Sequence, residues 1–323
     1  MINQPITIKN KTLKTRLIMP PMATSKSNDG YVSQALLNYY HEKSANPNFS
    51  LIITEHSYIN PQGKASINQL SIASDDSIEG LKQLVEVIHQ NDTFVLAQIN
   101  HAGGKTSTKI TNQPLLSASA IATPKSTATT LPEAMTITQI HQVIDDFVQS
   151  ALRAKKAGYD GVEIHMAHGY LLNQFYSPIT NHRNDEYTGS TIEGRIRLPL
   201  QIIQAIKEKV GPDFIIALRL GACDYQEGGT TIQDSIQAAI AFEKAGIDLL
   251  DISGGMCGYI NPTNKDQGYF KEITSAIKKH IQIPVILTGG ILDLEHADDL
   301  LKTNQADLIG IGRAFLKNSN WSK

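Results

Sequence analysis

The sequence predicts a (β/α)8 barrel, which is a closed parallel sheet of eight strands surrounded by helices. Eight short apolar segments recur along the 323 residues, and a helix-like segment follows each of them. The apolar segments are mostly continuous rather than alternating, as is typical of parallel strands buried on both faces. We see no linker or composition shift, so we assign residues 1–323 to a single domain.

The expected strands are short runs rich in Val, Ile and Leu. They are Leu17–Met22, Ser50–Glu55, Phe94–Asn100, Gly161–His165, Phe214–Leu220, Leu249–Ile252, Pro284–Thr288 and Leu308–Ile311. An open doubly wound sheet is the main alternative. The count of eight strands and the lack of an early Gly-x-Gly-x-x-Gly motif both disfavour it.

We expect helices between these strands, because apolar residues there fall at helical spacing. The segments are 81–88, 140–154, 192–210, 232–245, 270–279 and 294–301. Gly158, Gly211 and Gly246 stand where three of the helices should end.

Two segments fall outside the repeating pattern. Residues before Leu17 are expected to form an N-terminal lid segment. Gly104–Thr136, after the third strand, is rich in Ser, Thr, Pro and Lys. A loop of this length is usually functional or disordered, and at the C-terminal end of a barrel strand it would lie over the active site. A surface insertion is the other interpretation.

The composition is that of an ordinary globular protein, with a net charge of −2 and a pI of about 6.6. We therefore expect a small-molecule substrate and no nucleic-acid or membrane partner. The N-terminus lacks signal-peptide features, and no apolar run approaches the roughly 20 residues that span a bilayer. Cys223 and Cys257 are too few for a disulfide scaffold, an iron–sulfur cluster or a four-thiolate zinc site, and their scarcity favours the cytoplasm.

Two histidines and a tyrosine follow the fourth expected strand. Chemistry in such barrels takes place at strand C-termini, so His165, His168 and Tyr170 are well placed for catalysis. Histidine can donate to a developing oxyanion, and tyrosine can act as a general acid. Two other interpretations stay open: histidines that only stabilise a turn, or a metal site, although no nearby Cys or Glu-x-x-His completes a ligand set.

Glycine-rich turns follow the seventh and eighth expected strands, where many barrels bind phosphate. They contain Gly289-Gly290 and Gly312-Arg313. Glycine lets the backbone N–H groups approach an anion, and arginine adds a charged contact. The pattern favours a phosphate-bearing ligand, which could be a sugar phosphate as well as a nucleotide.

Polar residues also mark the third and fifth strands. Gln98 and His101 follow the third strand, and Arg219 lies inside the apolar fifth. An arginine is costly to bury without a partner. It therefore belongs either to a structural ion pair or to a ligand site in the barrel mouth.

Ordered motifs run along nearly the whole chain. They are Pro5–Lys9, Arg16–Met22, Asn60–Gly63, Gln98–Gly103, His165–Tyr170, Phe175–Pro178, Asn181–Tyr187 and Gly310–Arg313. Together they resemble the Old Yellow Enzyme family of NADH:flavin oxidoreductases, the FMN-dependent ene-reductases, and especially its bacterial single-domain branch.

This resemblance implies a non-covalent FMN, with NADH or NADPH as the reductant. The residues implied to hold the flavin ring are Pro20, Pro21, Met22, Ala23, His56, Gln98 and Arg219. Of these, His56 would contribute backbone contacts. The residues implied to hold the phosphate are Gly289, Gly290, Gly312 and Arg313.

The reaction implied is the reduction of an alkene activated by a carbonyl or nitro group. His165 and His168 would bind the substrate oxygen, and Tyr170 would supply a proton. Two alternatives remain: a lyase or isomerase that binds a sugar phosphate and uses a carboxylate such as Glu55 or Asp251, and a flavin-binding barrel without activity.

The sequence departs from the family pattern at a few positions. Ala23 stands where relatives often carry threonine or cysteine, Ser25 where some carry a substrate-binding tyrosine, and Glu133 where arginine is common. The sequence ends at Lys323, so we do not expect a C-terminal segment that reaches a neighbouring subunit. The oligomeric state is left open, a homo-oligomer included.

Overall fold

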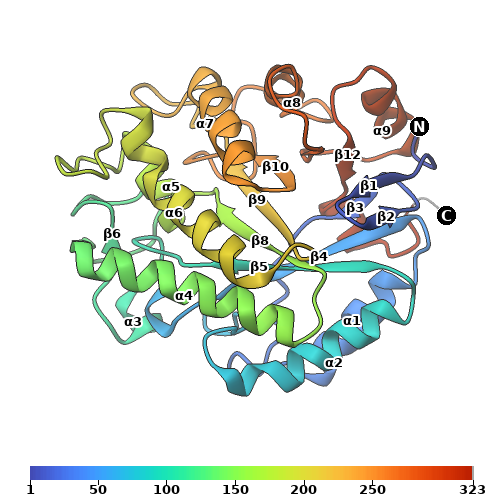
Figure 1. Ribbon diagram of the computed structural model, residues 1–323, viewed down its shortest axis with the longest axis horizontal. Coiled ribbons are helices and arrows are strands. Elements are labelled where there is room, and N and C mark those ends of the chain that lie inside the picture. Colours follow the sequence, from blue (N-terminus) through green and yellow to red (C-terminus); the bar gives the residue numbers. More distant parts are fainter. Residues whose placement is uncertain (322–323) are drawn as a thin grey trace.

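A closed eight-stranded parallel barrel forms the centre of the protein (Figure 1). The computed structural model describes residues 1–321. The barrel strands are β3 (Leu17–Met19), β4 (Phe49–Tyr58), β5 (Phe94–Asn100), β8 (Gly161–Met166), β9 (Ile215–Gly221), β10 (Leu249–Ser253), β11 (Val285–Leu287) and β12 (Leu308–Gly310). Each strand pairs with the next in this order, and β12 pairs with β3 to close the sheet. The predicted fold class and all eight predicted strands are confirmed.

Two strands, β3 and β4, differ most in length from the prediction. β3 ends at Met19, because Pro20 and Pro21 have no N–H to donate to a ladder. β4 continues to Tyr58 through a shift in its pairing with β5 between Thr54 and Ser57. Such a shift changes the direction in which the following side chains point.

Helices surround the barrel at the predicted segments. They are α2 (Ile78–His89), α4 (Ile137–Lys156), α6 (Ile192–Val210), α7 (Ile232–Ala245), α8 (Lys271–Ile277) and α9 (Leu294–Lys302). Gly211 and Gly246 cap α6 and α7 with positive φ angles, and Gly158 follows the cap of α4.

The prediction missed the following helices: α1 (Gln34–Ser44), α3 (Thr108–Thr111), α5 (Leu171–Tyr176), α10 (Arg313–Lys317), and the short 3-10 turns η1 (Pro61–Gly63) and η2 (Asp75–Ser77). Most are too short for a periodic pattern to emerge, and the buried face of α1 is largely tyrosine rather than aliphatic.

The N-terminal segment is a two-stranded hairpin, β1 (Ile6–Ile8) and β2 (Lys11–Leu13), which covers the N-terminal end of the barrel. Ile8 and Leu13 pack with inward-facing residues of seven barrel strands into one apolar cluster. Lys9 fastens the hairpin by donating to the Phe214 carbonyl and pairing with Asp248. The predicted lid is therefore present, at the end of the barrel opposite α5 and β6 (Leu116–Ser117) (Figure 1).

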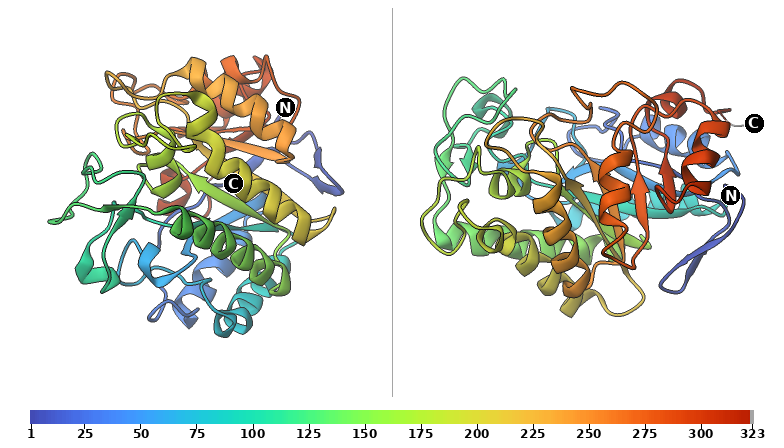
Figure 2. Two further views of the ribbon diagram at one scale, coloured as in Figure 1. Left: turned by 60° about the vertical axis from the view of Figure 1, so that its left-hand side comes forward. Right: turned by 90° about the horizontal axis from the view of Figure 1, so that it is seen from above.

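The Gly104–Thr136 excursion lies at the other end of the barrel, as both views in Figure 2 show. It contains α3, β6 and β7 (Glu133–Ala134), and β6 and β7 pair with each other. Arg183 holds it in place by donating to the carbonyls of Ala118 and Met135 while pairing with Asp185. Part of the resembling motif Asn181–Tyr187 thus has a structural role.

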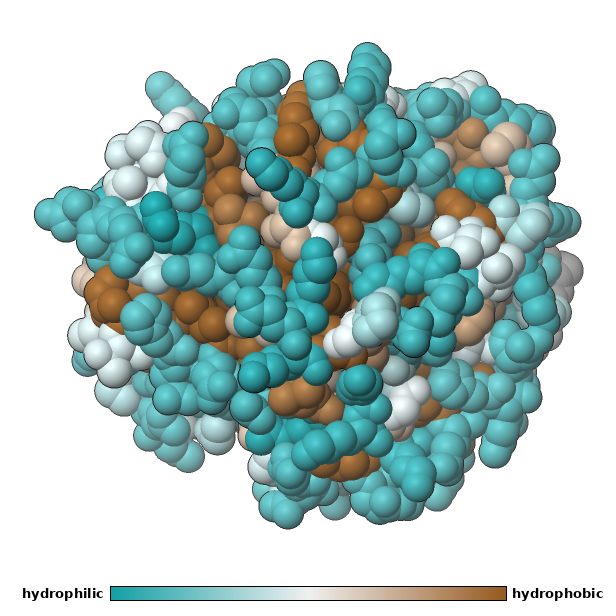
Figure 3. All heavy atoms as spheres, viewed as in Figure 1, coloured by the Kyte–Doolittle hydropathy of each residue, from teal (hydrophilic) through white to brown (hydrophobic). Residues whose placement is uncertain are grey.

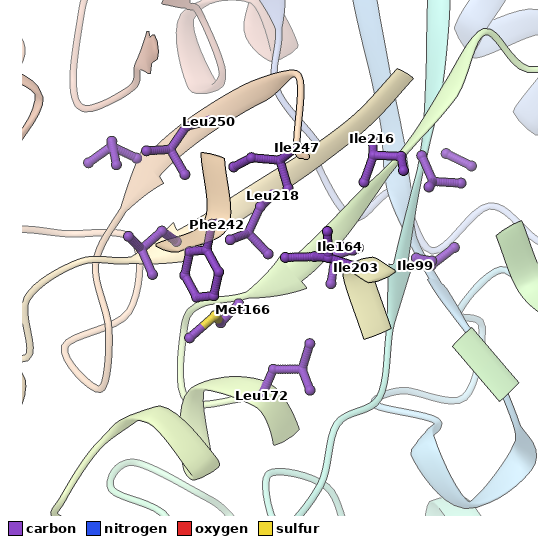
Figure 4. Close-up of a cluster of buried hydrophobic side chains, with 14 of the residues drawn as sticks. Ile99, Ile164, Met166, Leu172, Ile203, Ile216, Leu218, Phe242, Ile247 and Leu250 are labelled. Carbon is purple, nitrogen blue, oxygen red and sulfur yellow. The ribbon is translucent and has the colours of Figure 1, made fainter. Parts of the chain in front are cut away.

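Side chains of the barrel strands alternate between two environments. Ile164, Leu218 and Leu250 point outward and pack under the helices, where Ile203 and Phe242 meet them (Figure 4). The residues next to them, among them Glu163, His165, Arg219 and Asp251, then point into the barrel. Because the inward positions nearer the N-terminal ends of the strands are apolar, the polar side chains gather near the C-terminal ends.

The outer surface gives no sign of a membrane span. The face shown in Figure 3 is largely hydrophilic, with apolar side chains showing between polar and charged ones. No helix among residues 1–321 is both long and apolar enough to cross a bilayer.

Leu13→Ala tests whether the hairpin seals the barrel. Leu13 is 2% exposed, so its truncation should lower the free energy of unfolding by about 3 kcal/mol. The exposed neighbour Thr12 is the control, since Thr12→Ala should change stability by roughly 0.5 kcal/mol or less. Equal urea-unfolding curves for the two variants would show that the hairpin is not part of the core.

Candidate active site

His165, His168 and Tyr170 converge at the C-terminal end of β8. The His165 ring centroid lies 5.0 Å from that of His168 and 5.0 Å from that of Tyr170, edge-on to both. His168 and Gly169 both have positive φ, at 60° and 75°, so the chain turns sharply here before α5 begins. The His168 N–H closes the turn onto the Gly254 carbonyl, which ties it to the loop after β10.

Both histidines are held in the neutral form. Burial, the neighbouring His168 and the Arg219 charge lower the pKa of His165 well below its usual value. Burial and Arg219 do the same to the pKa of His168. His165 Nδ1 accepts from the Ala167 N–H at 3.2 Å, so its proton is on Nε2. His168 Nε2 lies 2.7 Å from Ser253 Oγ, and if that hydroxyl donates, His168 carries its proton on Nδ1.

Tyr170 keeps its phenolic proton, because burial raises its pKa to about 12. Lys105, from the excursion after β5, lies 5.8 Å from the centre of its ring and donates to the His168 carbonyl. Burial and the nearby Lys125 lower the pKa of Lys105. The excursion therefore contributes directly to the site, as predicted from its position.

A buried set of charges lies in the inward layer next to the histidines. Arg219 Nε is 3.1 Å from Asp251 Oδ2, and Gln98 Nε2 donates to Glu163 Oε2 at 2.6 Å. Burial and the Asp251 charge raise the pKa of Glu163 well above its usual value. Burial raises the pKa of Asp251 to about 6 against the opposing effect of Arg219. At neutral pH, Asp251 is thus the counterion of Arg219, and the raised pKa of Glu163 favours its protonated form.

Arg219 and Gln98 each retain unused hydrogen-bonding groups. The terminal nitrogens of Arg219 and the Oε1 atom of Gln98 have no hydrogen-bond partner among residues 1–321. These groups offer donors next to an acceptor, which fits the edge of a flavin, where an N–H is flanked by carbonyl oxygens. Both predicted interpretations of Arg219, ion pair and ligand contact, are compatible with this geometry.

The turns after β11 and β12 form a cradle of backbone donors. Gly289 and Gly290 have φ angles of 128° and 68°, and the Tyr269 ring packs so closely that a Cβ on either would lie 2.8 Å from it. Arg313 Nη2 donates to the Tyr269 hydroxyl at 3.2 Å, which links the two turns. Within the described chain, the N–H groups of Gly290, Gly312 and Arg313 donate to no protein acceptor. Unpaired N–H groups beside an arginine fit a phosphate.

The segment after β3 lies next to this cradle. A Cβ on Gly312 would be 3.1 Å from Met22 Sδ and 3.6 Å from Pro20 Cγ. On its other side, the N–H of Thr24 donates to Glu55, whose pKa is raised by burial to about 7. The structure thus brings Pro20–Ala23 between the phosphate cradle and β4.

The structure also adds residues that the sequence did not single out. Lys105 lies among many polar residues in the excursion after β5, and Tyr269 lies in a loop where an aromatic residue has no distinctive pattern. Glu163 is a charged residue in an otherwise apolar strand, and this pattern could have identified it as a candidate site residue. His101 has a structural contact instead. Its Nδ1 accepts a hydrogen bond from the Gly103 N–H at 3.0 Å, which stabilises the turn after β5.

Comparisons with known proteins agree with this geometry. A family model described as "NADH:flavin oxidoreductase / NADH oxidase family" matches residues 1–323. The chain belongs to this family. The resemblance to the Old Yellow Enzyme family of flavin oxidoreductases is thereby confirmed.

Relatives of this flavin oxidoreductase include an NADH oxidase of Thermoanaerobacter brockii, 40% identical over 98% of this chain and 49% of that protein. The chain thus spans about half the length of that relative. An NADPH dehydrogenase of Halalkalibacterium halodurans is 39% identical over 98% of this chain and 91% of its own length.

Solved structures superpose on nearly the whole flavin oxidoreductase. Morphinone reductase in complex with tetrahydroNAD has a TM-score of 0.86 at 26% identity, covering 99% of this chain and 88% of that one. The Old Yellow Enzyme homologue from Zymomonas mobilis has a TM-score of 0.84 at 26% identity, covering 99% and 90%. Family membership removes the support for a lyase or isomerase. Among residues 1–321, no group of three or more His, Cys, Asp or Glu side chains could hold a metal ion.

Glu163→Gln should change how the stability of the flavin oxidoreductase depends on pH. Glu163 has a raised pKa in the folded state, so its contribution to stability is complete below the unfolded pKa of about 4.3 and is lost as the pH rises towards the folded value. Between these two pH values, the free energy of unfolding of the wild type should fall by about 1.4 kcal/mol per pH unit relative to that of the glutamine variant.

Urea unfolding of both proteins between about pH 5 and 8 measures this difference. The control is Glu79→Gln on the exposed face of α2, which should follow the wild-type profile. Parallel profiles for Glu163→Gln and the wild type would mean that Glu163 is ionised in the folded protein.

Proposed function

We propose that this flavin oxidoreductase reduces carbon–carbon double bonds activated by a carbonyl or nitro group. The observation that carries the proposal is the convergence of two neutral histidines and one protonated tyrosine beside the residues that fit a flavin. We also propose that residues 1–323 act as one FMN-binding barrel domain in the cytoplasm, with a small activated alkene as the electron acceptor.

The residues proposed to hold FMN fall into two groups. Gln98 and Arg219 offer their unpaired groups to the polar edge of the ring, while Pro20, Pro21, Met22, Ala23 and the backbone of His56 border it. Gly289, Gly290, Gly312 and Arg313 hold the phosphate. FMN bound by these residues would supply hydride transfer from NAD(P)H to the alkene carbon remote from the activating group.

His165 and His168 bind and polarise the substrate in this proposal. A neutral imidazole N–H donates to the carbonyl or nitro oxygen and stabilises the negative charge that develops there. Each such donor is typically worth roughly 3 kcal/mol in the transition state. Because both rings are neutral, each carries one N–H that can donate and one nitrogen that can accept.

Tyr170 supplies the proton in this proposal. Its hydroxyl is protonated throughout the physiological pH range. The ring of His165 and the amino group of Lys105 both lie against the Tyr170 ring and restrain its orientation. In the proposed reaction, the O–H bond of Tyr170 breaks and a C–H bond forms at the alkene carbon next to the activating group. The phenolate regains its proton from solvent before the next turnover.

The test uses the holoenzyme under anaerobic conditions. The purified protein should carry FMN, lose its flavin absorbance when NADH or NADPH is added, and regain it when cyclohex-2-enone follows. His165→Ala and His168→Ala should each slow this reoxidation by about a hundredfold, the loss of one oxyanion donor. Reduction by the nicotinamide should continue in both variants.

His141→Ala, an exposed histidine of α4, is the matched control and should reoxidise at the wild-type rate. A reduced enzyme that no activated alkene reoxidises would refute the proposed reaction. Reoxidation that is equally fast in all three histidine variants would leave the reaction standing and refute the roles of His165 and His168.

A further inference from the structure

A third histidine, His56, reaches the site through an irregularity in β4. The pairing of β4 with β5 shifts between Thr54 and Ser57, and the backbone N–H of Glu55 leaves the ladder and donates to the Tyr40 hydroxyl at 2.8 Å. An irregularity of this kind redirects the side chains that follow it. Here it brings His56 to the rings at the end of β8.

His56 lies directly against the proposed catalytic residues. Its ring is stacked on that of Tyr170, with centroids 5.5 Å apart and an interplanar angle of 24°. It is also 6.2 Å from the ring of His165, edge-on. The family resemblance implies only a backbone contact between His56 and the cofactor, whereas the side chain lies against Tyr170 and His165.

The surrounding amides fix which ring nitrogen of His56 carries the proton. Gln69 Oε1 accepts from the Ala65 N–H at 2.6 Å, so the other end of this amide, Nε2, must face His56. Gln69 Nε2 donates to the His56 carbonyl at 3.1 Å and lies 3.0 Å from His56 Nδ1. A donor on Nδ1 requires that nitrogen to be unprotonated.

Asn100 Nδ2 lies on the same nitrogen, at 3.2 Å. Burial and the Arg219 charge lower the pKa of His56 to about 4, so the ring is neutral at physiological pH. Its single proton is therefore on Nε2. The Nε2 atom has no hydrogen-bond partner among residues 1–321. The side chain is partly exposed, and Nε2 is not enclosed by protein. A ligand in the site can reach this N–H.

The number of donors then limits the substrate. One carbonyl oxygen has two acceptor lone pairs, and the proposed function uses both for His165 and His168. The Nε2–H of His56 needs a second oxygen. We propose that His56 is a specificity-determining residue that binds a second carbonyl of the substrate, so that the preferred substrates are alkenes bearing two carbonyl groups, such as enediones.

This inference rests on the proposed function for the placement of the substrate, but binding to the oxidised enzyme tests it separately, because oxidised FMN cannot reduce the ligand. Isophorone and 4-oxoisophorone are a matched pair, since they differ only by a second ring carbonyl. Their dissociation constants for the oxidised holoenzyme can be measured from the change in flavin absorbance on titration.

The wild type should bind 4-oxoisophorone about fivefold to tenfold more tightly than isophorone, the effect of one neutral hydrogen bond. Two variants distinguish the effect of the Nε2–H hydrogen bond from the effect of ring stacking. The side chain of His56→Gln places an amide N–H near the position of Nε2 and should keep the preference. The shorter side chain of His56→Asn places its amide near Nδ1 and should lose it.

Four other binding outcomes contradict the inference. A wild type that binds the two ligands equally well, or an asparagine variant that keeps the preference, shows that His56 makes no such bond. Loss of the preference in both variants assigns the effect to ring stacking. If only the His56→Asn variant loses FMN, the Nε2–H of His56 binds the cofactor rather than the substrate. If the binding preference follows His56 but neither compound reoxidises the reduced enzyme, the proposed reaction fails and the binding site remains.

Discussion

The positive charge of Arg219, buried in the mouth of the barrel, is the constraint on which the protonation states of the site depend. A guanidinium cannot shed its proton, so its burial requires a counterion, and Asp251 provides it at 3.1 Å. Burial and repulsion by the Asp251 charge raise the pKa of the neighbouring Glu163 well above its usual value. The same positive charge, added to burial, keeps His56, His165 and His168 neutral. Burial is the largest cause of each of these shifts, and the Arg219 charge adds to it in the three histidines.

The geometry of the site follows from the two-residue repeat of the strands. Outward aliphatic residues pack under the helices, and the inward side chains are polar near the C-terminal ends of the strands and apolar below them. The N-terminal hairpin completes the floor. The irregularity in β4 adds His56 to the layer, at a position that a regular strand would not have turned toward Tyr170.

Much of this could be predicted from the sequence. Continuous apolar runs predicted all eight strands, because parallel strands buried on both faces leave that pattern. His165, His168 and Tyr170 were found because they lie at one strand end, and their rings do converge. The roles of these residues and of the flavin-binding set remain proposals.

What could not be predicted depends on contacts between distant segments. The pairing of Arg219 with Asp251 joins two strands, and the contact of Lys105 with His168 joins an excursion to a turn. The tautomer of His56 depends on the orientation of Gln69, which is set in turn by the Ala65 backbone. No local pattern encodes such chains of contacts, and pairing shifts such as that in β4 have no reliable sequence signal.

The most direct test of the central claim is the protonation state of the histidines in the FMN-bound enzyme. Ring ¹⁵N spectra of histidine-labelled protein, assigned with the single-histidine variants, can be recorded between about pH 5 and 8, where an unperturbed imidazole titrates. We predict that the signals of His165 and His168 stay at neutral-ring positions throughout, and that Asp251→Asn, which leaves Arg219 without its counterion, does not make either ring cationic. A titration of either ring with a pKa near 6.5 would contradict the claim, because the substrate would then meet an imidazolium rather than a neutral donor.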